Sequence, residues 1–155
     1  MSATEARIIL EGDGVKSGIY DERDANDATV KPGMALELSG TDGKVQKRTN
    51  RVPLLIAVEE ALRWDAREDT KPIHRAYASG DKVPHIRPYP GMKLNLRLAD
   101  AQTVTVRSYL KRDAVGTWVT TTTATEAEAE AMEAVTSDSS DADTLLVAAR
   151  IIRAV

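Results

Sequence analysis

A short phrase that occurs twice constrains the fold of this chain most strongly. Residues 32–38 read PGMALEL and residues 90–96 read PGMKLNL, so the pattern P-G-M-x-L-x-L is present in two copies. Proline fixes its own φ and glycine accepts a positive φ, so each Pro-Gly pair predicts a tight turn. The alternating residues that follow are typical of a strand. Two copies of a turn followed by a strand suggest a duplicated β-architecture; chance recurrence is the alternative, because such turns are common before strands.

The second copy of the phrase also predicts which side chains face water. Successive residues of a strand point to opposite faces of the sheet. One face carries Met92, Leu94, Leu96 and Leu98, and the other carries Lys93, Asn95 and Arg97. We therefore expect a strand with one buried face and one solvated face.

Most of the remaining chain predicts strands as well. Apolar or alternating runs bounded by turn residues are typical of strands. Such runs lie at residues 8–10, 15–20, 44–48, 73–77, 82–87, 103–107, 117–123 and 145–152. The charged run at residues 21–27 has no apolar face and predicts an exposed loop that joins an N-terminal arm to the main body.

Two segments fit both a helix and a strand. Residues 53–62 begin with a proline that can start a helix and show helical spacing, but a predicted hairpin precedes them, so we prefer a strand. In residues 125–135 alanine and glutamate favour a helix by propensity, while their alternation matches a strand.

The residues with catalytic or ligand-binding chemistry form no known motif. The chain has no cysteine, and neither of its two histidines, His74 and His85, has carboxylates spaced to complete a metal site. The sequence contains no P-loop, no nucleophile elbow and no dinucleotide-binding glycine motif. We therefore expect no enzyme activity, no cofactor and no metal.

The charge balance and hydropathy disfavour two further classes of partner. With 24 acidic and 21 basic residues the net charge is −3, which argues against nucleic-acid binding. Apolar runs fall short of membrane-spanning length, so we expect a soluble protein made in the cytoplasm, with no membrane association.

Several short phrases occur in an order that is more specific than any of them alone. They are VKPG at 30–33, DGKV at 42–45, AVE at 57–59, YASGDKV at 77–83, LA at 98–99, a turn at Gly116, AMEAV at 131–135 and DTLLV at 143–147. This order resembles that of the head decoration, or capsid cement, proteins of tailed viruses, and the resemblance covers residues 29–155. The chain departs from that pattern in a longer, more charged link at residues 62–72 and in a glutamate-rich lead into Met132.

The resemblance implies a mainly β fold, with a small β-barrel or β-tulip body at residues 29–155 and an extended N-terminal arm at residues 1–28. It also implies a structural virion protein, often a homotrimer, that binds the outer surface of an icosahedral capsid and clamps adjacent major capsid subunits. The candidate contacts with the capsid or a neighbour are Ile8, Ile9, Leu10, Ile19 and Tyr20. A small β-barrel binding module for nucleic acid or carbohydrate is the alternative function.

Overall fold

The computed structural model describes residues 8–11, 20–40, 42–48, 53–59, 75–137 and 145–153. Within these ranges every regular element is a strand, which confirms the predicted mainly β fold. The strands are β1 (Ile9–Glu11), β2 (Tyr20–Asp24), β3 (Ala35–Leu38), β4 (Val45–Lys47), β5 (Leu55–Ala57), β6 (Lys82–Ile86), β7 (Lys93–Arg97), β8 (Thr103–Val104), β9 (Tyr109–Arg112), β10 (Trp118–Thr121), β11 (Ala129–Ala131), β12 (Val135–Thr136) and β13 (Leu146–Ile151).

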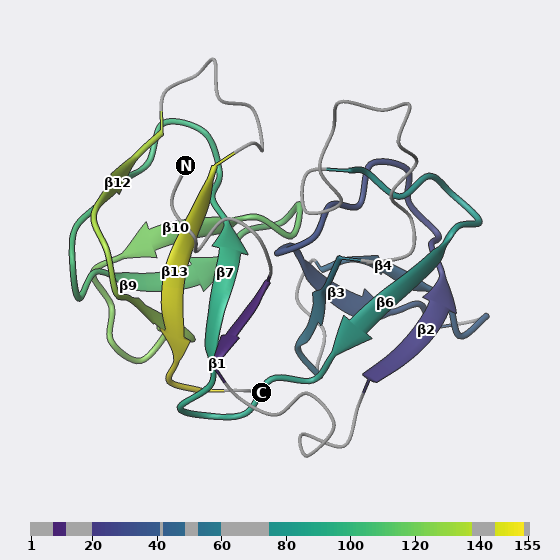
Figure 1. Cartoon of the computed structure of the whole chain (residues 1–155), viewed down its shortest axis with the longest axis horizontal. Helices are drawn as coiled ribbons and strands as arrows, with labels where there is room; N and C mark the ends of the chain where they lie inside the picture. Colours follow the sequence, from purple (N-terminus) through teal and green to yellow (C-terminus); the bar gives the residue numbers. More distant parts are fainter. Residues whose placement is uncertain are drawn as a thin grey trace.

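A five-stranded antiparallel sheet forms one half of the molecule, on the right in Figure 1. Its order is β2-β6-β5-β3-β4. The sheet curls, because Ala25 at the end of β2 forms a parallel bridge with Val45 in β4. Asn26 completes this junction by donating its N–H to the carbonyl oxygen of Val45 at 2.7 Å.

A six-stranded sheet forms the other half, on the left in Figure 1, in the order β1-β7-β13-β11-β9-β10. It curls in a similar way, since Leu98 just after β7 bridges Trp118 in β10. A separate pair, β12 and β8, lies beside it. Among the described residues the strand ladder does not run all the way round either sheet, and single bridges connect strands across the gap, so each half is a strongly curled sheet and no closed barrel is formed.

Both copies of the repeated phrase form the predicted turn and strand. Met34 donates its N–H to the Lys31 carbonyl oxygen at 3.2 Å, and Met92 does the same to the Tyr89 carbonyl oxygen at 3.1 Å. Each turn contains a glycine of positive φ, as a type II turn requires. The first turn leads into β3 and the second into β7, so each sheet contains one copy.

Strands β3 and β5 of the five-stranded sheet are buried on both faces. Ala35 and Ile56 belong to a large core shared with the six-stranded sheet, whereas Leu36 and Leu55 belong to a second core on the opposite face. A strand buried on both faces reads as a continuous apolar run. This explains the sequence of residues 53–58 and confirms the preferred strand there, β5.

Several local predictions are wrong. Residues 21–27 are not all loop, because β2 extends to Asp24 and pairs with β6; an edge strand tolerates the polar side chains that suggested a loop. The strand predicted at 103–107 ends at Val104 and gives way to a turn at residues 105–108. For residues 125–135, where helix and strand were both left open, the structure shows strand at β11 and at the start of β12.

The predicted solvated face of β7 is also wrong. Asn95 and Arg97 are both buried, although Lys93 remains partly exposed. The turn that contains Pro32 and Gly33 lies against this end of β7: Arg97 donates from Nε and Nη2 to the Pro32 carbonyl oxygen at 3.0 and 2.9 Å. The guanidinium is therefore a buried link between the first repeat and the second.

Candidate functional site

The structure places four of the five predicted contact residues of the N-terminal segment in or beside the sheets. Ile8 is fully buried, and its N–H donates to Glu59 Oε2 at 2.9 Å. Ile9 is partly buried against the shared core. Of the others, Leu10 lies in β1, Tyr20 lies in β2, and Ile19 falls outside the described residues.

A capsid-contact role for these residues stays a prediction, as does the division into an arm of residues 1–28 and a body from residue 29. In this arrangement β1 pairs with β7 and β2 pairs with β6. The side chain of Ile8 would reach a partner only if β1 left its sheet.

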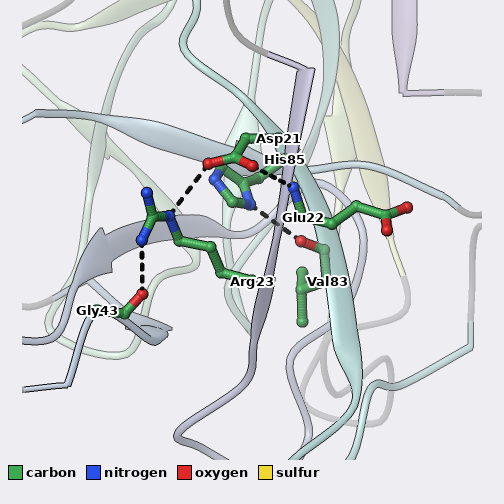
Figure 2. A network of polar contacts seen from close by, with 6 residues as sticks. All are labelled: Asp21, Glu22, Arg23, Gly43, Val83 and His85. Carbon is green, nitrogen blue, oxygen red and sulfur yellow. Dashed lines mark hydrogen bonds and ion pairs between the residues drawn. The ribbon is translucent and has the colours of Figure 1, made fainter.

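Polar contacts run along the outer strand β2, as Figure 2 shows. Arg23 donates from Nε to Asp21 Oδ2 at 3.1 Å and from Nη1 to the Gly43 carbonyl oxygen at 3.0 Å, which connects β2 to the turn between β3 and β4. Asp21 Oδ1 accepts the main-chain N–H of Glu22 at 2.9 Å. Solvated pairs of this kind stabilise a fold little. The main effect of the network is that Asp21 occupies the main-chain N–H of Glu22 at the sheet edge.

The imidazole of His85 lies buried beneath this network, with Nδ1 2.9 Å from the Val83 carbonyl oxygen. Because a carbonyl only accepts, Nδ1 carries the proton of the neutral ring. Burial lowers the pKa of His85, while the Val83 carbonyl and the charge of Asp21 act in the opposite direction. His85 is therefore a neutral structural residue near pH 7.

Side chains also occupy main-chain donors on two other outer strands. Asp27 Oδ2 accepts the Lys47 N–H of β4 at 2.6 Å. Gln102 Oε1 accepts both the N–H and the hydroxyl of Thr120 in β10, at 3.0 and 3.2 Å. A partner that added a strand at β2, β4 or β10 would first displace one of these side chains. Recognition at these edges is thus disfavoured, and the sheet faces are better candidates.

A groove of about 310 Å³ lies on one sheet face and is the candidate binding surface. Its lining residues are Lys93, Val106, Arg107, Glu130, Ala131, Met132 and Arg150. Arg150 is the Cα partner of both Lys93 and Glu130, so one row crosses β7, β13 and β11. The neighbouring residues Leu94 and Ala149 enter the shared core, which means that this row faces away from the core.

The turn at residues 105–108 forms one wall of this groove. Ser108 donates its N–H to the Thr105 carbonyl oxygen at 2.9 Å, and Arg107 donates its N–H to the Ala131 carbonyl oxygen at 2.8 Å. Arg107 has a φ of +71°, in the left-handed region that glycine normally occupies. The turn therefore holds an exposed arginine in a costly backbone conformation beside the groove.

The groove combines exposed apolar groups with positive charge. Val106 and Met132 are 59% and 43% exposed, which is high for apolar side chains. Three basic residues line the groove against the single carboxylate of Glu130, which Arg150 Nη2 contacts at 3.3 Å. Such an arrangement can bind an anionic group next to an apolar one.

Sequence patterns did not single out Val106, Arg107 or Met132. The alternation through residues 103–107 predicted a continuing strand, because arginine gives no signal for a left-handed conformation. Met132 belongs to a phrase noted only for its order in the chain. The pairing of β7, β13 and β11, which joins distant segments, creates the groove.

The described part of the chain lacks both a metal-binding cluster of side chains and a helix that could span a membrane. In those residues no three His, Asp or Glu side chains gather to hold a metal ion. None of the described segments forms a helix long and apolar enough to cross a membrane. Of the two histidines, His85 is buried and His74 lies outside the described residues.

Comparison with known proteins identifies a shared fold. No protein-family model and no curated protein matches this chain. The crystal structure of the head fiber gp8.5 N base of bacteriophage phi29 matches with a TM-score of 0.52 and 16% sequence identity. The match covers 88% of this chain and 95% of the phi29 chain. The two proteins therefore have a common β architecture over nearly their whole length.

Proposed function

We propose that this chain is a structural protein of a tailed-phage head, which binds the outer surface of the capsid and clamps adjacent major capsid subunits. The observation that carries the proposal is the fold shared with the phi29 head fiber base over 88% of the chain. The phrase order at residues 29–155, which resembles that of head decoration proteins, supports the same role.

The structure suits a protein that acts through surface area. Gly33 connects the two sheets, because its carbonyl oxygen accepts the N–H of Arg97 at 3.0 Å and Nε1–H of Trp118 at 3.2 Å. Gly116, on the turn before β10, accepts the N–H of Ala35 at 2.7 Å. These buried contacts join the two halves, so a load applied to one is transmitted to the other.

Attachment to two neighbouring capsid subunits adds interface that must break before the subunits separate. Stable interfaces bury roughly 1,200–2,000 Å² in ordinary complexes. If three copies assemble, as the resemblance to head decoration proteins implies, the second and third contacts form within one particle and raise the overall avidity.

Sedimentation with capsids tests this function. Purified protein is mixed with undecorated capsids, pelleted, and quantified against capsid protein. We expect saturable binding at a fixed ratio, and excess untagged protein should displace a tagged copy. Analytical ultracentrifugation of the free protein tests the trimer. Absence of binding, or tight binding to an oligonucleotide or glycan array instead, would contradict the proposal.

A further inference from the structure

We propose that the groove beside the 105–108 turn binds an extended acidic segment of a neighbouring protein, with Arg107 holding a carboxylate of that segment. The inference rests on the proposed function, in which the neighbour is a capsid subunit. It specifies which face of this protein makes the contact and what chemistry the contact uses.

The charge of the groove selects an acidic partner. Lys93, Arg107 and Arg150 line it against one carboxylate, in a chain whose net charge is −3. Glu130, the one carboxylate of the lining, pairs with Arg150, so it does not neutralise the guanidinium of Arg107. An arginine guanidinium binds a carboxylate through two parallel hydrogen bonds, which gives both affinity and orientation.

The apolar groups of the groove select an extended segment rather than a free anion. Val106 and Met132 expose apolar surface beside the basic side chains. A small free carboxylate would leave the apolar surface of Val106 and Met132 exposed to water. An extended peptide presents acidic and apolar side chains in alternation, so it can cover Val106 and Met132 while a carboxylate reaches Arg107.

The backbone of Arg107 supports a role outside the fold. Glycine would adopt the φ of +71° without steric cost, yet this position carries a bulky cation on an exposed turn. Ion pairs among the described residues do not include Arg107. Strained backbone conformations persist at sites where function uses them, so a binding role accounts for the conformation of Arg107.

The first test separates binding from folding. Arg107→Gly removes the guanidinium and relieves the backbone, so we expect an equal or higher midpoint of urea unfolding together with capsid affinity reduced about tenfold or more. The matched control is Ala101→Gly, which relieves a φ of +55° on another exposed turn and should leave capsid affinity unchanged. Equal affinity of Arg107→Gly and wild type would overturn the inference.

The second test identifies the occupant. Because the chain has no cysteine, Val106→Cys introduces a unique thiol that can carry a benzophenone cross-linker. Val115→Cys is the control, because Val115 is 55% exposed, close to the 59% of Val106, and does not line the groove. After irradiation on capsids, we expect the Val106→Cys adducts to map to an acidic capsid segment and the control adducts to map elsewhere.

Each outcome of the cross-linking has a definite meaning. Adducts on a basic or neutral segment, or between two copies of this chain, would overturn the acidic occupant while leaving capsid attachment intact. The pelleted fraction is measured in the same sample. Failure of the wild-type protein to pellet would instead reject the proposed function, and the inference with it.

Discussion

Gly33 and Gly91 have the same place in the same turn, with φ of +87° and +93°, but only Gly33 is enclosed. A Cβ atom on Gly33 would lie 3.0 Å from both the Arg97 amide nitrogen and the Asn95 carbonyl oxygen, and 3.1 Å from Leu146 Cδ2. A Cβ atom on Gly91 would meet nothing within 4 Å. The two copies of the repeated phrase therefore differ in what surrounds them, although their local structure is the same.

This difference predicts unequal costs for one substitution at the two sites. Gly91→Ala should lower the free energy of unfolding by about 1–2 kcal/mol, the cost of a left-handed alanine. Gly33→Ala adds backbone contacts that cannot move away, so its cost should be about 1–3 kcal/mol larger. Urea unfolding of the two variants, followed by circular dichroism, measures both values. Equal costs would show that Gly33 is not enclosed as described.

The buried guanidinium of Arg97 predicts a second effect on stability. Arg97→Met removes both donors to the Pro32 carbonyl oxygen, so the free energy of unfolding should fall by about 2–4 kcal/mol. Arg87→Met, at an exposed position, is the control and should change it by less than about 0.5 kcal/mol. The midpoints of urea unfolding give the comparison. If both variants unfold at the wild-type midpoint, the link between the repeats is not needed.

Predictions from local chemistry were the reliable ones. A Pro-Gly pair determines its own turn, so both repeats and the strands after them could be predicted from the sequence. Residues 53–58 read as a strand once the hairpin before them was recognised. The mainly β fold follows from such local patterns.

Predictions that depend on distant segments were not reliable. The alternation of β7 indicated two faces, but only the tertiary structure shows that the Pro32 turn covers Asn95 and Arg97. Likewise β2 gains its place by pairing with β6, not from an apolar face of its own. The groove at Arg107 needs three strands that the sequence does not place side by side.

The buried imidazole predicts a pH dependence. Burial lowers the pKa of His85 below 6.5, so the unfolded chain binds this proton at a higher pH than the native chain does. The contribution of the neutral His85 ring to the free energy of unfolding is fully present above about pH 6.5. It decreases as the pH drops toward the lower native pKa, by at most about 1.4 kcal/mol per pH unit.

Replacement of the imidazole tests this assignment. His85→Gln keeps a donor for the Val83 carbonyl and does not titrate, so it removes only the contribution of His85. The decrease in the free energy of unfolding between pH 7.5 and 5.5 should therefore be smaller in the variant than in wild type. Identical decreases would assign the pH dependence to other groups.

The ion pair between Arg112 in β9 and Glu128 just before β11 predicts strong coupling, because the two side chains are only 16% and 8% exposed. Burial lowers the pKa of Arg112 to about 10, and the charge of Arg48 acts in the same direction, so the guanidinium is still charged at pH 7. Glu128→Gln leaves that charge without its carboxylate and should cost roughly 3–5 kcal/mol.

A double-mutant cycle with Arg112→Met and Glu128→Gln measures the coupling. The double variant should recover part of the loss, because no uncompensated guanidinium remains at Arg112, and the coupling energy should exceed about 1 kcal/mol. The matched control is the neighbouring pair Lys111 and Glu126, which are 2.6 Å apart but 39% and 51% exposed. Water screens this second pair, so its coupling should stay below about 1 kcal/mol. Similar values for the two cycles would show that burial does not strengthen the Arg112 pair.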